Sequence, residues 1–172
     1  PPSLVTLERD RKPVDALVQI TKDGHVWVLD RATGESLFPL QEFAVPASDL
    51  PGELAAETQV LPVLPEPFAR QTLSDDDLTR RTPEAAAKVR EMVAGMAPHQ
   101  AFLPPGLEGQ VVFPGLDGGG EWGGGAFDPA TNLFYVNANE MGWLVRMVET
   151  GASAPQTASG LYQAQCAACH GR

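Results

Sequence analysis

The feature that most constrains the fold is a strand–turn–strand pattern that occurs twice. Residues 118–139 begin with a glycine cluster around Trp122 and continue through the turn sequence DPATN (128–132) into an alternating apolar stretch. Residues 25–38 have the same order, with the turn sequence DRATG (30–34) between two apolar runs. Pro presets φ in such turns, whereas Asn and Gly tolerate positive φ. The two copies predict a repeated β-hairpin unit, as in a repeat protein or a piece of one.

Composition indicates a mainly β protein. The 172 residues are 43% hydrophobic and 20% charged, which is ordinary for one globular domain. The 17 glycines and 16 prolines give turns and loops a large share, so we expect few regular helices. The net charge of −10 argues against a nucleic-acid partner, which requires a basic surface. No apolar run approaches the roughly 20 residues of a membrane span, and the start at Pro1-Pro2 without Met is interpreted as a processed or cut N-terminus.

Apolar runs predict strands at five places along the chain. They cover residues 14–20, 25–29, 110–113, 133–137 and 143–148. The first two are separated by Lys22-Asp23-Gly24, and an Asp-Gly pair between apolar runs predicts a hairpin. Lys22 is therefore expected at a strand end. Residues 1–12 are polar and indicate no particular structure.

Residues 39–109 have a different pattern, in which prolines interrupt the apolar runs. Such runs are too short for central strands, so this stretch is expected to form an extended arm inserted between β units. Two short helices are predicted within it. Ser74 precedes three acidic residues that suit the start of a helix. Thr82 followed by Pro83 predicts the second helix start, and Gly95 is expected to end that helix.

The C-terminal sequence Cys166-Ala-Ala-Cys169-His170 is the c-type haem attachment pattern. Two thiols one helical turn apart can reach the vinyl groups of a porphyrin, and the adjacent His can ligate the iron. A thioredoxin-like redox pair and half of a zinc site are the alternatives. Residues 150–159 have the composition of a flexible linker. Residues 160–172 are expected to be the start of a cytochrome c domain.

Four segments, taken in order, resemble the C-terminal blades of the pyrroloquinoline quinone (PQQ)-dependent, or quinoprotein, dehydrogenases. They are VQITKDGHVWVLDRATGESLFP, FARQTLSDDDLT, FLPPGLEGQVVFPG and GGGEWGGGAFDPATNLFYVNANEMGWLVRMV. Membrane glucose dehydrogenase-like and related sugar or alcohol dehydrogenases look most similar, and CxxCH resembles the cytochrome c tail of quinohaemoprotein members. The resemblance implies an eight-bladed β-propeller. Since a blade takes about 40–45 residues, we expect residues 1–149 to be a fragment with two to three blades.

The resemblance also implies roles for three residues. Lys22 matches the lysine that hydrogen-bonds the reactive carbonyl oxygens of PQQ, where a cation stabilises the negative charge that develops. Trp122 matches a tryptophan beside the quinone, although an aromatic packed between blades is the alternative reading. Glu121 stands where many members have Asn. A carboxylate there must be protonated, paired to a cation such as Lys22, or turned away from the quinone.

These inferences combine into one hypothesis. The chain is expected to be part of a periplasmic or secreted dehydrogenase that oxidises an alcohol, polyol or aldose with PQQ and Ca²⁺. Electrons then pass to haem c and to a respiratory cytochrome or other acceptor. The calcium ligands and catalytic aspartate are expected outside this chain, so this piece alone is expected to be inactive. The alternative is a non-enzymatic propeller fragment with a structural, partner-binding or electron-transfer role. Exposed edge strands are expected to favour self-association.

Overall fold

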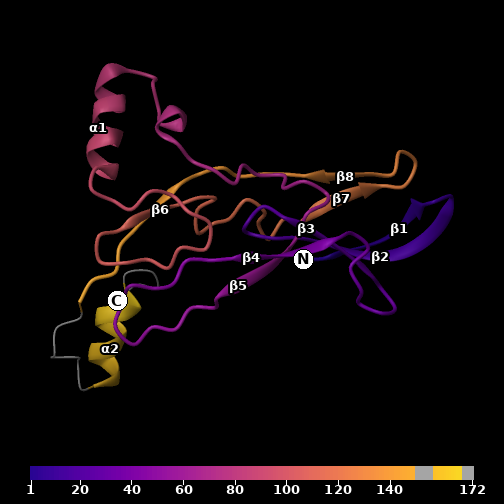
Figure 1. Cartoon of the computed structure of the whole chain (residues 1–172), viewed down its shortest axis with the longest axis horizontal. Coiled ribbons are helices and arrows are strands. Elements are labelled where there is room, and N and C mark those ends of the chain that lie inside the picture. Colours follow the sequence, from indigo (N-terminus) through magenta and orange to yellow (C-terminus); the bar gives the residue numbers. More distant parts are fainter. Residues whose placement is uncertain (150–156, 168–172) are drawn as a thin grey trace.

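The computed structural model describes residues 1–149 and 157–167. Within these residues the protein is mainly β, with two short α-helices, α1 (Pro83–Val93) and α2 (Ala158–Gln165), and one 3-10 turn at Asp75–Asp77. No helix in the described part is long and apolar enough to cross a membrane. The two α-helices lie at the same end of the molecule, away from the main sheet (Figure 1).

The main sheet consists of β1 (Ser3–Arg9), β2 (Lys12–Ile20) and β3 (Val26–Asp30), paired antiparallel in that order. β2 and β3 confirm the predicted hairpin. β1 was not predicted, and it buries Val5 and part of Leu7 while Leu4 is exposed. Its turn to β2 has positive φ at Asp10 and Arg11, as two-residue type I′ hairpin turns require. The N-terminal residues are thus an integral strand rather than an unstructured lead-in.

The core lies between the main sheet and a second hairpin, β7 (Gly125–Asp128) and β8 (Leu133–Val136). Its buried residues come from all three strands of the main sheet: Val5, Ala16, Val18, Ile20, Val26 and Val28. Phe127 and Phe134 of the hairpin pack against them. Asn132, at the hairpin turn, accepts a hydrogen bond from the Glu8 backbone N–H and so ties β1 to this hairpin.

The two turns with related sequences are built alike. The Asp30 carboxylate accepts hydrogen bonds from the backbone N–H groups of Ala32 and Thr33, at 2.8 and 2.9 Å. Asp128 does the same for Ala130, at 2.9 Å. Both aspartates therefore hold their turns through hydrogen bonds from the backbone to the side chain. The copies differ after the turn, since the second forms the β7–β8 hairpin, whereas the first makes only an isolated bridge between Leu29 and Ser36.

The inserted stretch contains one hairpin and the second of the two predicted helices, whereas the helix predicted after Ser74 is only a 3-10 turn at Asp75–Asp77. β4 (Leu40–Ala44) pairs with β5 (Thr58–Pro62) in a separate and largely exposed sheet. At the start of α1, the Thr82 hydroxyl accepts a hydrogen bond from the Ala85 N–H at 3.1 Å, which confirms the predicted cap. Gly95 has a φ of +77° just beyond the helix.

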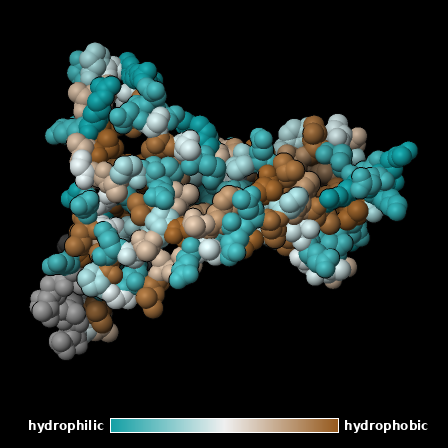
Figure 2. Space-filling model, in the orientation of Figure 1, coloured by the Kyte–Doolittle hydropathy of each residue, from teal (hydrophilic) through white to brown (hydrophobic). Residues whose placement is uncertain are grey.

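The chain then returns to short strands, with β6 (Gln110–Val112) paired antiparallel to β9 (Trp143–Val145). Each sheet formed by the described residues has two or three strands, whereas a propeller blade has four. The expected two to three blades therefore remain a prediction. Apolar side chains reach the surface in several patches, including the end that holds the main sheet (Figure 2).

Candidate functional site

Lys22 lies in the turn between β2 and β3, as predicted. The turn is closed by backbone hydrogen bonds from Thr21 to His25 and from Gly24 to Thr21, both 3.0 Å. Gly24 has a φ of +87°, and an added Cβ would lie 2.9 Å from the Cβ of Ala69. The turn therefore requires glycine, and it leaves Lys22 projecting from the strand end.

The glycine cluster runs along this turn. The Gly119 N–H donates to the Lys22 carbonyl at 2.7 Å, and the Gly120 N–H donates to the Thr21 carbonyl at 3.2 Å. A Cβ on Gly118 would lie 2.5 Å from Cγ of Lys22. The absence of side chains therefore allows the two backbones to approach closely here. These three glycines are buried against protein, so the approach serves to join two chain segments rather than to admit a ligand.

The Lys22 ammonium is held in place by the same loop. Its Nζ donates to the carbonyl oxygen of Leu116 at 2.7 Å. An ammonium has three N–H donors, so this bond leaves capacity for a further acceptor. Lys22 and the glycine loop are therefore joined through both side-chain and backbone hydrogen bonds.

Glu121 and Trp122 line a pocket of about 270 Å³. Lys22 does not line this pocket. The Glu121 carboxylate accepts a hydrogen bond from the Asn139 side chain at 3.1 Å, so its described partner is Asn139 rather than Lys22. Trp122 is 87% exposed among the described residues, and the alternative that it packs between blades stays a prediction. Gly123 has open space where a side chain would stand, which leaves room beside the indole. The structure thus places the three candidate PQQ residues on two pockets.

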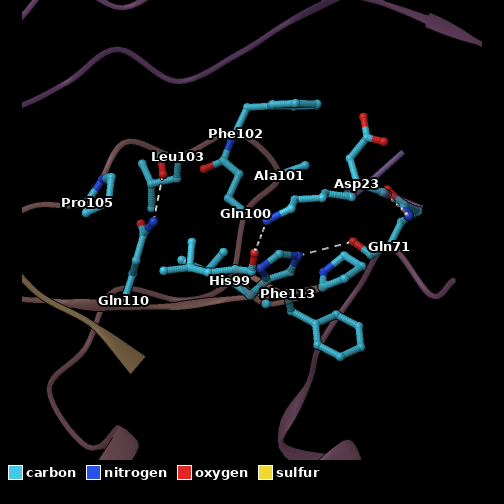
Figure 3. Close-up of a pocket in the computed structure, with 15 residues that line it drawn as sticks. Asp23, Gln71, His99, Gln100, Ala101, Phe102, Leu103, Pro105, Gln110 and Phe113 are labelled. Atoms are coloured by element: carbon cyan, nitrogen blue, oxygen red, sulfur yellow. Dashed lines mark hydrogen bonds between the residues drawn. The ribbon is translucent and has the colours of Figure 1, made fainter. Parts of the chain in front are cut away.

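Lys22 instead lines a cavity of about 310 Å³ beneath residues 100–105 (Figure 3). Its walls are largely apolar, and its polar lining includes His99 and Gln110. His99 Nδ1 lies 3.3 Å from the Val111 carbonyl oxygen, and Nε2 lies 3.2 Å from the Gln71 carbonyl oxygen. A neutral imidazole donates from one nitrogen only, so both contacts are hydrogen bonds only when the ring is protonated.

Sequence reasoning missed this cavity. No sequence pattern singled out His99, and Gln110 was one residue of a predicted strand. Both residues come from the arm and the strand that follows it, and no local pattern links them to Lys22. Only the close packing of the arm on the β2–β3 turn, through the hydrogen bond from Gln71 to the Asp23 carbonyl at 2.7 Å, brings them together.

Asp23, beside Lys22, is an ionised carboxylate that accepts hydrogen bonds within the same turn. Burial alone would raise the pKa of its carboxyl group, but hydrogen bonds with His25 and Thr21 outweigh burial and lower this pKa below its usual value. The His25 Nδ1 lies 3.5 Å from Asp23 Oδ1, and His25 is buried at 5% exposure. The Asp23 carboxylate therefore stabilises the turn that presents Lys22.

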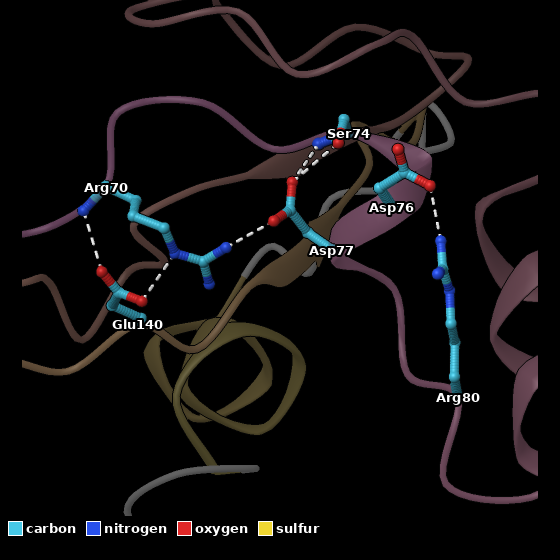
Figure 4. A network of polar contacts seen from close by, with 6 residues as sticks. All are labelled: Arg70, Ser74, Asp76, Asp77, Arg80 and Glu140. Carbon is cyan, nitrogen blue, oxygen red and sulfur yellow. Dashed lines mark hydrogen bonds and ion pairs between the residues drawn. The ribbon is translucent and has the colours of Figure 1, made fainter.

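Arg70 connects the arm to the segment after the glycine loop (Figure 4). Its Nε donates to Glu140 at 2.7 Å, its backbone N–H donates to the same carboxylate at 2.9 Å, and its Nη1 donates to Asp77 at 2.5 Å. The hydrogen bonds from the Arg70 backbone and side chain lower the pKa of Glu140. Arg70 also lies over the Phe113 ring, 5.3 Å from its centre.

The predicted haem site lies at the edge of the described residues. Cys166 is exposed and directly follows α2, whose start is capped by Thr157. Cys169 and His170 lie outside the described residues. The helix begins at Ala158, two residues before the expected boundary of the cytochrome start. In residues 1–149 and 157–167, no group of three or more His, Cys, Asp or Glu side chains is arranged to hold a metal ion.

Comparison with known proteins gives one consistent family. The family model described as the glucose/ethanol/alcohol dehydrogenase β-propeller domain (PQQ) matches residues 1–168. The quinate/shikimate dehydrogenase (quinone) of Acinetobacter baylyi is 33% identical over 149 residues, which are 86% of this chain and 18% of that protein. The quinoprotein glucose dehydrogenase of Gluconobacter oxydans is 32% identical over 155 residues, which are 90% of this chain and 19% of that protein.

A more distant relative is the glycerol dehydrogenase large subunit of Gluconobacter oxydans. It is 29% identical over 137 residues, which are 76% of this chain and 18% of that protein. This chain spans about a fifth of the length of these relatives. No solved structure matches the chain.

Proposed function

The chain belongs to the PQQ-dependent glucose/ethanol/alcohol dehydrogenase β-propeller family, and we propose that it supplies part of the quinone-binding end of such a dehydrogenase. The observation that carries the proposal is the Lys22 ammonium, held by Leu116 at 2.7 Å at the end of a β-hairpin, with donor capacity to spare. When bound, PQQ would supply the two-electron oxidation, as the acceptor of one hydride equivalent from the substrate.

The residues present fit PQQ in part. PQQ is a planar, anionic quinone, and Lys22 offers a fixed cation for an oxygen on which negative charge develops. Trp122 offers an exposed indole with open space beside Gly123. Glu121 does not fit an anionic ligand, because the hydrogen bond from the Asn139 amide orients its carboxylate without neutralising it. We propose that Lys22 stabilises the charged quinone oxygen and that Trp122 lines one face of the site.

The experiment that tests this proposal is a titration of the full chain with PQQ in the presence of Ca²⁺, followed by absorbance and tryptophan fluorescence. Saturable binding is expected, and Lys22→Ala should weaken it. Lys12→Ala is the matched control, since Lys12 lies at the opposite end of β2. An unchanged affinity in Lys22→Ala, or an equal loss in both variants, would contradict the assigned role.

The substrate is proposed to be an alcohol, polyol or aldose. The relatives are named for quinate or shikimate, glucose and glycerol, which are small hydroxylated molecules. The calcium ligands and the catalytic aspartate base are proposed to come from blades outside this chain. The chain alone is therefore expected to bind PQQ without turning over substrate.

Electron transfer is proposed to continue through haem c, attached at Cys166 and Cys169 with His170 as an iron ligand. The exposed Cys166 at the end of α2 is compatible with thioether formation. Haem attachment of this type and the family resemblance favour a periplasmic or secreted location, with a respiratory cytochrome or other acceptor as partner. The test is expression with cytochrome c maturation enzymes, in which a covalent haem spectrum should appear and be lost in Cys169→Ser.

The alternative is a non-enzymatic propeller segment with a structural, partner-binding or electron-transfer role. The observation that favours it is coverage, since the chain spans about a fifth of the relatives. Self-association through the edge strands β1 and β3 of the main sheet belongs to this proposal. Covalent haem and a concentration-dependent mass in light scattering, without PQQ binding, would favour this alternative.

A further inference from the structure

The cavity beneath residues 100–105 contains a buried hydrogen-bond acceptor without a donor. Gln110 is 4% exposed, and its Nε2 donates to the Leu103 carbonyl at 2.7 Å. This bond fixes which end of the amide is the oxygen. Its Oε1 has no hydrogen-bond donor among the described residues. A buried carbonyl oxygen without a donor costs free energy, so this atom has a strong preference for a ligand that donates.

The loop over the cavity is strained at Phe102. This residue has a φ of +60°, a conformation that bulky side chains rarely adopt. The Leu103 N–H donates to the Gln100 carbonyl at 3.2 Å and so closes the turn around it. Figure 3 shows the Phe102 ring on one side of the cavity and the Gln110 amide directed to Leu103. Backbone strain of this kind concentrates at ligand-binding sites, where contacts with a ligand repay it.

Charge on the cavity wall selects the kind of ligand. Lys22 and Asp23 both line the cavity, so its wall carries one cation and one anion. The Asp23 carboxylate accepts from Thr21 and from the His25 backbone through Oδ1, whereas the Lys22 ammonium has N–H donors to spare for a ligand. A hydroxyl group suits Gln110, and a carboxylate suits Lys22.

The remaining walls are apolar and suit the body of a small ring. They include Phe102, Leu103, Pro105, Val112 and Phe113. Pockets for small molecules generally have such walls with a few polar groups that fix orientation, and volumes upward of about 300 Å³. The volume of about 310 Å³ limits the ligand to a single small ring.

We propose that this cavity binds a hydroxylated cyclic carboxylate, with the hydroxyl donating to Gln110 Oε1 and the carboxylate accepting from Lys22. Gln110 is then a specificity-determining residue. The proposal rests on the proposed function, because Lys22 serves both PQQ and this ligand, which would lie beside the quinone. Because Gln110 Oε1 is covered in this structure, binding requires the 100–105 loop to shift, and strain at Phe102 favours such a shift.

The test is calorimetric titration of the full chain, without PQQ, with three probes. Quinate has the ring, hydroxyls and carboxylate, cyclohexanecarboxylate lacks the hydroxyls, and glucose lacks the carboxylate. Quinate should bind at least about tenfold more tightly than either of the other two. Equal affinities, or no binding of quinate, would overturn the proposal.

Substitution of Gln110 identifies the residue responsible. Gln110→Met removes the acceptor at nearly constant volume and should raise the Kd for quinate about 5- to 10-fold. Gln100→Met is the matched control, because Gln100 is a more exposed glutamine on the same cavity and should have no effect. PQQ titration of both variants separates the two proposals, since PQQ affinity should not change. Equal Kd values for quinate in Gln110→Met and Gln100→Met would contradict the proposed role of Gln110.

Discussion

The Lys22 ammonium and the Leu116 carbonyl are hydrogen-bonded at 2.7 Å across 94 residues of sequence. This bond joins the β2–β3 turn to the loop that precedes the glycine cluster. The backbone bond from Gly119 to the Lys22 carbonyl, also 2.7 Å, lies beside it. The position of the proposed quinone-binding cation therefore depends on the glycine loop as much as on its own hairpin.

Gly118→Ala should disrupt this arrangement. The φ of Gly118 is +94°, and a Cβ would lie 2.7 Å from the Lys22 Cα, which only a backbone shift can relieve. The left-handed conformation and the overpacking together should cost about 2 to 4 kcal/mol of unfolding free energy. Urea denaturation measures this change. Gly123→Ala is the control, since nothing lies within 4 Å of its Cβ position, and an equal loss in both variants would show that crowding against Lys22 is not the cause.

Local signals in the sequence were sufficient for the β2–β3 hairpin, the α1 cap and the two aspartate-held turns. Each of these depends on residues within a few positions of one another, such as Thr82 and Ala85. β1 was missed because only Val5 is buried in it and its apolar residues do not alternate strictly with polar ones, so its pairing with β2 has no clear local signal.

The candidate site was predicted in part. The position of Lys22 at a strand end was predicted, whereas the separation of Lys22 from Trp122 into two pockets was not foreseen. The cavity with His99 and Gln110 depends on how the arm packs over the turn. That packing is a long-range property, with no periodic or spacing signal near either residue.

Asp23→Asn should lower stability in a pH-dependent way. Burial opposes ionisation of Asp23, but its hydrogen bonds with His25 and Thr21 lower its pKa below the unfolded value. Its contribution is therefore fully present above the unfolded pKa of about 4 and is lost as pH falls through the lower, folded pKa. Urea unfolding at pH 7 and at pH 3 should show the variant less stable at pH 7, with a smaller difference at pH 3. A difference that is constant with pH would exclude the ionised carboxylate as the cause.

Thr82→Ala should loosen α1 without unfolding the core. The hydroxyl caps the Ala85 N–H at 3.1 Å, and loss of such a cap costs about 1 kcal/mol. Helix α1 makes few contacts with other elements, and Ala86 is its one buried residue. Hydrogen exchange should therefore accelerate by roughly fivefold in residues 85–93, while β2 exchange stays unchanged. Thr82→Ser retains the cap and should exchange at the original rate, and equal acceleration in both variants would contradict the capping role.

Arg70→Lys should weaken the attachment of the arm, although it preserves the charge. The guanidinium donates to Glu140 and to Asp77 at once, and a single ammonium cannot reproduce this forked geometry. The backbone bond from residue 70 to Glu140 remains, so we expect a modest fall in Tm rather than unfolding.

Arg80→Lys is the matched control, because Arg80 makes one exposed ion pair with Asp76 within the same arm. Differential scanning fluorimetry at low and high salt should show a larger fall in Tm for Arg70→Lys at both concentrations, since a forked hydrogen-bonded pair depends on geometry as well as on charge. Identical Tm values for the two variants would mean that the fork does not hold the arm in place.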